Sequence, residues 1–154
     1  MNAELIAAYL DGADLLKRTV AGMTTEQARA RPVAGRWSTL EVASHLADFE
    51  PIFADRIKRI VAMDHPILMA ADEVPYSQTL CYQERNLNDE VELIVLTRRQ
   101  LATILRAAPP DVWQRVGVHS HAGHVTIEQL LAQATRHIPH HVPFIVEKRK
   151  ALGI

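Results

Sequence analysis

The sequence contains almost no cysteine, no run of basic residues and no long uncharged apolar segment. Its one cysteine, Cys81, excludes an intrachain disulfide and fits a reducing compartment. No apolar run approaches the roughly 20 residues that cross a bilayer, and the first residues include acids where a signal peptide has Lys or Arg. A net charge of −1 without a basic stripe argues against nucleic acid or a membrane as a partner. We therefore expect a cytoplasmic protein, with Cys81 as a small buried residue rather than a nucleophile.

The composition is that of a globular protein. The 154 residues are 48% hydrophobic and 23% charged, which is enough for one domain, spanning residues 1–154, with its own core. The unusual number is eight histidines, which makes a metal site worth testing.

Apolar residues recur with helical period in four long segments, at residues 3–23, 38–64, 88–108 and 126–148. Two of the starts have capping-box spacing, Ser38 with Glu41 and Thr126 with Gln129, and Asn88 is the expected cap of the third segment. No strand pattern is evident. The sequence predicts an all-α four-helix bundle.

Residues 65–87 show no clear period and contain two prolines. We interpret them as a long crossover between helices 2 and 3, with a short helix near residues 78–83. Long connections inside compact domains are often functional.

The last helical segment contains three histidines, His137, His140 and His141. His137 and His141 are four residues apart at the edge of the apolar stripe, where Cβ atoms are roughly 5–6 Å apart. Both imidazoles can therefore reach one metal ion. His140 points to the other side of an ideal helix, so we expect it to be solvated.

His45 is the best third ligand, because it lies at the stripe edge of another long helix, and bundles build metal sites between facing helices. Asp48 or Glu41 could hold its second ring nitrogen. Glu50 falls within the apolar stripe. It is either a core ion-pair partner, with an arginine such as Arg98, or a base beside the metal.

Other interpretations compete with this site. Taken alone, His45 is more often a partly exposed boundary residue. His119, His121 and His124 form a rival metal cluster, although their setting in a glycine-containing loop favours pocket-rim histidines. Core packing is the expected role of the aromatic residues that could instead wall a pocket, namely Trp37, Tyr76 and Trp113.

Two motifs together resemble a known family. Residues 35–50, GRWSTLEVASHLADFE, resemble the second-helix signature of the DinB-like superfamily, Trp-Ser-x-x-Glu-x-x-x-His-Leu-x-Asp. Residues 118–141, VHSHAGHVTIEQLLAQATRHIPHH, resemble a later segment of its YfiT-like branch of metal-dependent hydrolases. There a histidine-containing loop leads into a final helix with His-x-x-x-His and an adjacent histidine.

The resemblance implies a crossover bundle that holds a divalent metal, commonly zinc or nickel, through His45, His137 and His141. It also implies a homodimer. Characterised relatives include thiol-dependent transferases and isomerases, so a low-molecular-weight thiol is a candidate cofactor. Pro139 and Pro143 depart from the family pattern, and a helix restarting at Pro139 would make His137 and His140 the usable pair.

Two classes of function follow. In the first, the metal activates water or a thiol against a small-molecule substrate. In the second, a non-catalytic bundle binds metal for stability or serves in a stress response. A structural site would be closed by a fourth ligand, with His140 or Asp48 as candidates, whereas a catalytic site keeps an open position.

Overall fold

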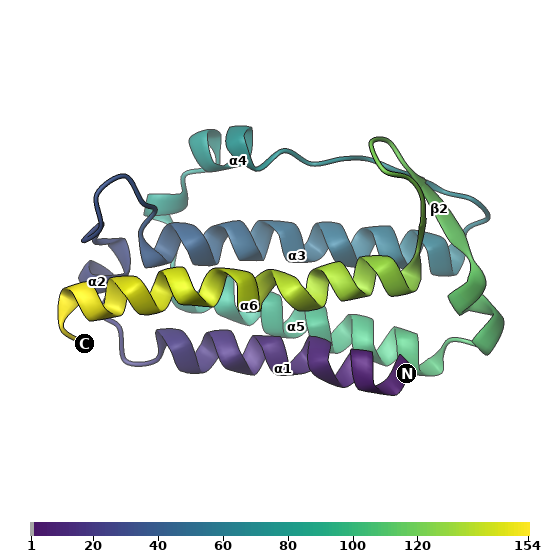
Figure 1. The fold of residues 1–154 in the computed structure, drawn as a ribbon, viewed down its shortest axis with the longest axis horizontal. Coiled ribbons are helices and arrows are strands. Elements are labelled where there is room, and N and C mark those ends of the chain that lie inside the picture. The colour runs from purple at the N-terminus through teal and green to yellow at the C-terminus, as the bar shows by residue number, and fades with distance from the viewer. Residues whose placement is uncertain (1) are drawn as a thin grey trace.

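The computed structural model describes residues 2–154, which fold as a bundle of four long helices (Figure 1). The elements in chain order are α1 (Asn2–Val20), α2 (Thr25–Arg29), α3 (Thr39–Ala62), β1 (Ile67–Leu68), α4 (Glu73–Thr79), the 3-10 turn η1 (Tyr82–Glu84), α5 (Leu87–Ala107), the 3-10 turn η2 (Pro110–Gln114), β2 (Val116–His119), β3 (Gly123–Thr126) and α6 (Ile127–Leu152). The predicted four-helix bundle is confirmed. None of the helices between residues 2 and 154 combines the length and apolar composition that a membrane span requires.

The order of the helices around the bundle differs from their order in the chain. Helices α1 and α3 each pack against both α5 and α6, so α1 and α3 occupy opposite corners (Figure 1). Helices α3 and α5 run in the same direction, and the chain must therefore return from the end of α3 to its start. The predicted crossover between them is confirmed.

The crossover passes over α3 and contains two short helical segments, α4 and η1 (Figure 1). The single helix expected at residues 78–83 is wrong, because Asp72 caps an earlier helix and accepts a hydrogen bond from Val74 N at 3.0 Å. Cys81 breaks the helical path with φ = 52° and is exposed, contrary to the buried position expected for it. Gln83 Nε2 then donates to Ser38 Oγ at 2.9 Å, which ties the end of the crossover to the start of α3.

A small three-stranded sheet closes one end of the bundle, although the sequence shows no strand pattern. Strand β1 pairs in parallel with β2, and β2 pairs antiparallel with β3. The strands have two to four residues, too few for alternation to show. Gly117 permits the close approach of β2 to α3 and β1, because a Cβ there would lie 2.7 Å from Leu68 Cδ1.

The predicted helix starts are confirmed at two of three positions. Ser38 and Thr126 both form capping boxes, with Glu41 and Gln129 respectively. The third helix begins two residues earlier than expected, because Asn86, not Asn88, accepts hydrogen bonds from the first backbone N–H groups.

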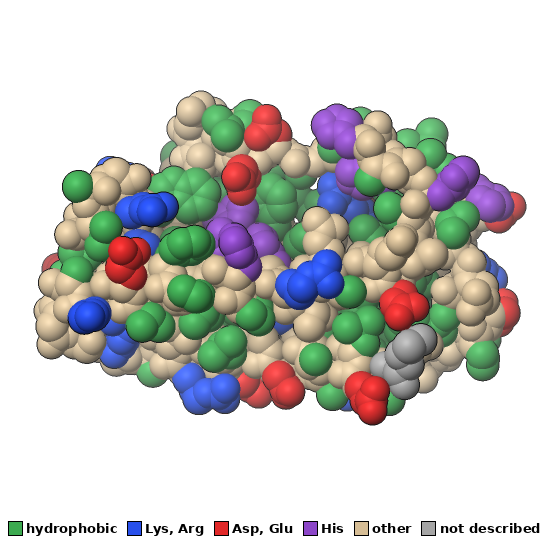
Figure 2. Space-filling view, in the orientation of Figure 1, with side chains coloured by type: hydrophobic (Ala, Val, Ile, Leu, Met, Phe, Trp, Pro, Cys, Tyr) green, Lys and Arg blue, Asp and Glu red, His purple; other side chains and the backbone are tan. Residues whose placement is uncertain are grey.

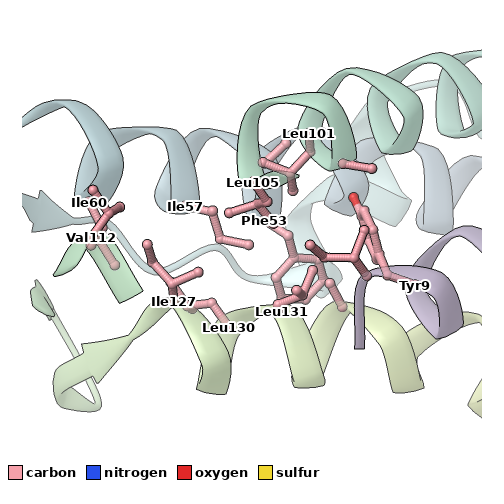
Figure 3. Packing of buried hydrophobic residues seen from close by; sticks show 14 of the residues in the cluster. Tyr9, Phe53, Ile57, Ile60, Leu101, Leu105, Val112, Ile127, Leu130 and Leu131 are labelled. Atoms are coloured by element: carbon pink, nitrogen blue, oxygen red, sulfur yellow. The ribbon is translucent and has the colours of Figure 1, made fainter. Parts of the chain in front are cut away.

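The buried apolar residues form two clusters along the bundle. One cluster packs around Phe53, Leu101 and Leu131 (Figure 3), and the other around Leu16, Leu46 and Ile138. On each of the four long helices the two clusters are separated by a short stretch. These stretches contain Gly12, Glu50, Arg98 and His137 in turn. The middle of the bundle is therefore a polar layer between two apolar clusters.

Candidate metal centre

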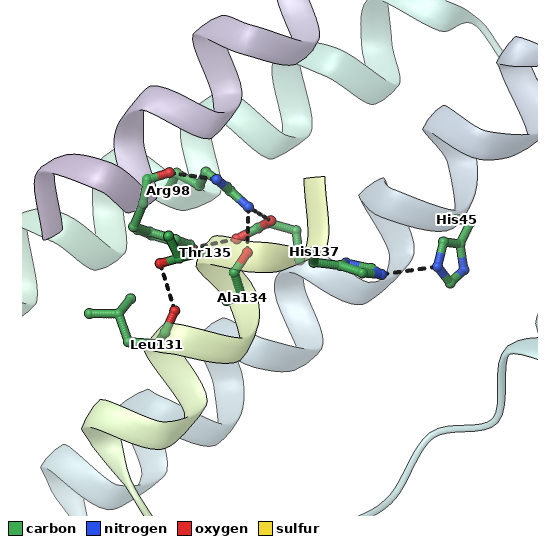
Figure 4. A network of polar contacts seen from close by, with 8 residues as sticks. His45, Arg98, Leu131, Ala134, Thr135 and His137 are labelled. Carbon is green, nitrogen blue, oxygen red and sulfur yellow. Dashed lines mark hydrogen bonds and ion pairs between the residues drawn. The ribbon is translucent and has the colours of Figure 1, made fainter. Parts of the chain in front are cut away.

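One half of the polar layer is a closed ion-pair network. Arg98 is fully buried and donates to Glu50 Oε2 at 2.8 Å and to the Ala134 carbonyl at 3.0 Å (Figure 4). It also donates to the carbonyl of Tyr9, whose hydroxyl donates to Glu50 Oε1. A Cβ at Gly12 would lie 2.4 Å from an Arg98 nitrogen, so this glycine makes room for the guanidinium. Glu50 is therefore the predicted core ion-pair partner, and both of its oxygens are occupied.

The other half is a cluster of three histidines from α3 and α6. His45 Nε2 lies 3.1 Å from His137 Nε2 (Figure 4), and one ligand nitrogen of each of His45, His137 and His141 lies within 4.8 Å of the others. His45 is 1% exposed, and the other two are partly buried. The structure thus brings together the three histidines that the sequence singled out.

Helix α6 runs unbroken through Pro139 and Pro143. His141 therefore stays one turn after His137, and their ring centroids are 5.0 Å apart. His140 is exposed, and its ring packs against those of His141 and Phe144. The alternative pairing of His137 with His140, which required a helix break, does not form.

The expected carboxylate partner of the second His45 nitrogen is wrong. Asp48 Oδ1 accepts a hydrogen bond from Arg85 at 2.8 Å. Glu41 is held by Arg31 and by the backbone N–H of Ser38, and these hydrogen bonds help lower its pKa to about 2. His45 Nδ1 and His137 Nδ1 are buried and have no hydrogen-bond partner among residues 2–154.

Burial keeps all three imidazoles neutral. It lowers the pKa of His137 to about 3 and that of His141 to about 4, and the neighbouring histidines lower both further. Burial also lowers the pKa of His45, although Glu73 and Asp48 oppose this shift. At neutral pH the cluster therefore presents lone pairs rather than positive charge.

These residues fit a divalent metal ion. Tetrahedral nitrogen ligands about 2.0–2.1 Å from zinc lie roughly 3.3 Å from one another, close to the 3.1 Å between His45 and His137. Three neutral histidines are a well-attested ligand set for a catalytic ion with an open position. Zinc and nickel both accept imidazole, so the donor set does not discriminate between them.

An acid that the sequence analysis missed lies beside the cluster. Glu73, at the start of α4, places Oε2 3.8 Å from His45 Nε2, and its side chain is 58% exposed. Only the path of the crossover brings it there, so no local pattern could have indicated it. Neither fourth ligand considered earlier, Asp48 or His140, belongs to the cluster.

The rival cluster at residues 119–124 does not converge. Within the described residues 2–154, the only group of three or more potential ligands is His45, His137 and His141. His119 Nδ1 instead accepts hydrogen bonds from the backbone N–H groups of His121 and Ala122, each at 3.2 Å, and stabilises the tip of the hairpin. His121 lines a neighbouring pocket, as expected for a rim residue.

Two pockets flank the three-histidine cluster. A pocket of about 520 Å³ lies between the crossover and the hairpin and includes Phe49, Glu73 and His121. Figure 2 shows histidine side chains at the floor of a hollow between α4 and the hairpin. A second pocket, of about 220 Å³, includes Trp37 and His141.

The aromatic residues divide between these surroundings and the core. Trp37 packs against the second apolar cluster, as expected, and it also contacts the His45 ring at 5.4 Å and lines the smaller pocket. Tyr76 contacts the Phe49 ring and lines a pocket beside Arg56. Trp113 packs against the main core, as expected.

The fold and the cluster define a crossover four-helix bundle with a three-histidine centre. The sequence profile of the DinB superfamily matches residues 8–145, and the chain belongs to this superfamily. The expected family membership is confirmed.

Relatives in sequence and structure agree with this assignment. A "putative metal-dependent hydrolase" of Oceanobacillus iheyensis is 27% identical over 140 residues, covering 88% of this chain and 80% of that protein. A protein of the same description from Geobacillus thermodenitrificans is 29% identical over 153 residues, covering 97% of this chain and 85% of that protein.

Two solved structures share the fold. The first is YfiT from Bacillus subtilis, described as "a probable metal-dependent hydrolase with an unusual four-helix bundle topology". It superposes with a TM-score of 0.87 at 22% identity, covering 99% of this chain and 87% of that one. A mycothiol-dependent maleylpyruvate isomerase superposes with a TM-score of 0.73 at 13% identity, covering 93% of this chain and 60% of that one.

Proposed function

We propose that this protein is a metal-dependent hydrolase of small-molecule esters or amides, with one divalent ion held by His45, His137 and His141. The observation that supports it is the convergence of three neutral imidazoles, one buried and two partly buried, which form the only such group among residues 2–154. A bound zinc or nickel ion would supply Lewis acidity and lower the pKa of coordinated water toward about 7.

The residues around the cluster have separate roles in this proposal. Glu73 Oε2, on the solvent side, is placed to accept a proton from a water molecule beside the cluster. Trp37 and Phe49 pack against the His45 ring at 5.4 and 4.8 Å and fix its orientation in place of a hydrogen bond to Nδ1.

A second candidate is thiol-dependent transfer. An ion with an open position can also bind and deprotonate a thiol, and the mycothiol-dependent isomerase shares the fold. Hydrolysis is preferred here because both sequence relatives are described as hydrolases. The homodimer and the cytoplasmic location remain predictions.

Elemental analysis of the untagged protein tests the ligand assignment. We expect about one zinc or nickel ion per chain in the wild type and none in His45→Ala or His141→Ala. His140→Ala is the matched control, because His140 is an adjacent exposed histidine on the same helix. Stoichiometric metal that survives both ligand substitutions would overturn the assignment.

Glu73→Gln then separates an enzyme from a metal-stabilised bundle. Hydrolysis of 4-nitrophenyl hexanoate should fall about 10²–10⁴-fold in kcat while the metal content is unchanged. Turnover that appears only with an added thiol would favour transfer. A metal-loaded protein inactive under both conditions would favour the non-catalytic bundle.

A further inference from the structure

Lys148 is a buried cation without an acidic partner. It is 1% exposed, and its Nζ donates to the Phe144 carbonyl at 2.8 Å. Among residues 2–154 no carboxylate forms an ion pair with it. An ammonium group has three donors, and buried charges in proteins are normally paired. Lys148 therefore has capacity to bind an anion that the protein itself does not supply.

A second cation lies close to Lys148. Burial lowers the pKa of Lys148, and the charge of Arg36 adds to this shift, while the carboxylates of Glu147 and Glu41 oppose it. The Arg36 side chain makes no hydrogen bond or ion pair with any residue that the structure describes. Glu41, the nearby buried acid, is already held by Arg31 at 2.9 Å and by the Ser38 amide at 2.7 Å. Two cations are thus close together here, and no carboxylate of the described residues forms an ion pair with either of them.

Both cations line the pocket that adjoins the metal cluster. Besides Arg36 and Lys148, this pocket of about 220 Å³ is walled by Trp37, Phe144 and His141. Figure 2 shows cationic and apolar side chains next to the central histidines on this face. A molecule in this pocket would contact an apolar wall, positive charge and a metal-cluster histidine at once.

The helix sets the order of these groups along the pocket. His141 and Lys148 are seven residues apart on α6 and so lie on nearly the same face, and Lys148 Nζ reaches back to the Phe144 carbonyl one turn away. Phe144 lies between them. A ligand that reaches both ends is elongated, with an apolar middle.

We propose that this pocket selects the substrate through its acidic end. Lys148 and Arg36 bind a carboxylate or phosphate, Trp37 and Phe144 cover an apolar chain, and the ester or amide bond lies at the histidine cluster. The substrate class is then an ester or amide with an anionic group that an apolar chain separates from the bond that is broken. This inference rests on the proposed function only for the hydrolysis, since anion binding can be measured without it.

Binding of octanoate to the metal-free protein tests the anion site alone. In a Trp113→Phe background the remaining tryptophan is Trp37, so its fluorescence reports binding in the pocket. Lys148→Met should weaken octanoate binding about tenfold or more, because a charge-assisted contact is lost. The exposed Lys150, two residues away on the same helix, provides the control Lys150→Met, which should bind as the wild type does.

Neutral octanamide and octyl phosphate define what is recognised. Octanamide should bind weakly and independently of Lys148, and tighter binding of octyl phosphate than octanoate would identify the acidic group as a phosphate. Equal binding of octanoate and octanamide, or octanoate binding unaffected by Lys148→Met, would overturn the anion site. A thermal melt checks the fold of Lys148→Met, which we expect to be intact because an apolar residue replaces a buried charge.

Hydrolysis of two esters tests whether the anion site takes part in substrate selection. The mono-4-nitrophenyl ester of suberic acid ends in a carboxylate, and its methyl-capped form is neutral. In the zinc-loaded protein, Lys148→Met should reduce the kcat/KM preference for the charged ester about tenfold. Lysine-dependent octanoate binding without hydrolysis of either ester would overturn the hydrolase and leave the anion site. Equal hydrolysis of both esters, together with octanoate binding that does not depend on Lys148, would overturn the anion site and leave the hydrolase.

Discussion

The Arg98 network and the histidine cluster meet on α3, where Glu50 and His45 are five residues apart, and they are organised in opposite ways. In the Arg98 network, Glu50 receives hydrogen bonds on both oxygens, and Arg98 donates to two backbone carbonyls as well. In the histidine cluster, two Nε2 atoms face each other at 3.1 Å, and Nδ1 of His45 and of His137 has no partner.

The difference distinguishes a structural polar group from a ligand site. Buried polar groups lower the stability of a fold unless they are hydrogen-bonded. In the Arg98 network both Glu50 oxygens and the two terminal guanidinium nitrogens meet this requirement within the chain, and only Arg98 Nε lacks a partner among the described residues. In the histidine cluster Nδ1 of two rings lacks a partner among the described residues, and the ring nitrogens that converge are the atoms assigned to the metal in the proposed function.

Arg98→Met breaks the Arg98 network, which is the closed half of the polar layer, and should have the largest effect on stability. It leaves Glu50 and two backbone carbonyls without their donor, so the free energy of unfolding should fall by about 3–5 kcal/mol. Urea unfolding followed by circular dichroism measures this. The double variant Glu50→Leu with Arg98→Met removes both charges and should recover part of the loss. A cost below about 1 kcal/mol for the single variant would contradict a structural role.

Zinc bound at the histidine cluster, the open half of the polar layer, should stabilise the folded protein by less than Arg98→Met destabilises it. At a free concentration 100 times the Kd, a ligand that binds only the folded state adds about 2.7 kcal/mol. We expect Tm to rise on zinc addition to the wild type and to His140→Ala, and to return after chelation. His45→Ala should show no rise. An equal rise in His45→Ala would place the metal elsewhere.

Acid should destabilise the metal-free protein through the histidine cluster. The pKa of His137 is about 3 in the folded state and about 6.5 in an unfolded chain, so between these values the unfolded state binds a proton that the native state does not. Stability therefore falls as pH decreases from about 6.5 toward 3, by up to about 1.4 kcal/mol per pH unit for this histidine. Urea unfolding at several pH values should show a shallower slope in His137→Gln. An identical slope would show that His137 is not the group responsible.

The closed half was largely predictable from the sequence. Helical period placed Glu50 in an apolar stripe and Arg98 in another, and an acid in such a position requires a partner. Capping chemistry likewise located Ser38 and Thr126 at helix starts, because these hydrogen bonds are local. The grouping of His45, His137 and His141 in the histidine cluster was predicted from helix faces together with the family resemblance, and their role as metal ligands stays a prediction.

The surroundings of the open half were not predictable, because they depend on segments without periodicity. Glu73 approaches His45 only because the crossover passes over α3, and Glu41 is taken by Arg31 from the preceding loop. Lys148 lies outside every motif, and its lack of an acidic partner is evident only once burial is known. The strands also escaped prediction, since two to four residues contain too little pattern.

Substitution of the hairpin histidines should have the smallest effect on stability and on metal content, because these residues lie outside the histidine cluster. His121 and His124 are exposed, and replacing either with Ala should change stability by less than about 0.5 kcal/mol and leave metal content unchanged. His119→Ala should cost about 1 kcal/mol, because its Nδ1 accepts two backbone hydrogen bonds at the turn, again without metal loss. Elemental analysis of the triple variant, with thermal melts of each single variant, measures both quantities. Loss of metal in the triple variant would mean that histidines close in sequence, rather than those brought together by α3 and α6, bind the ion.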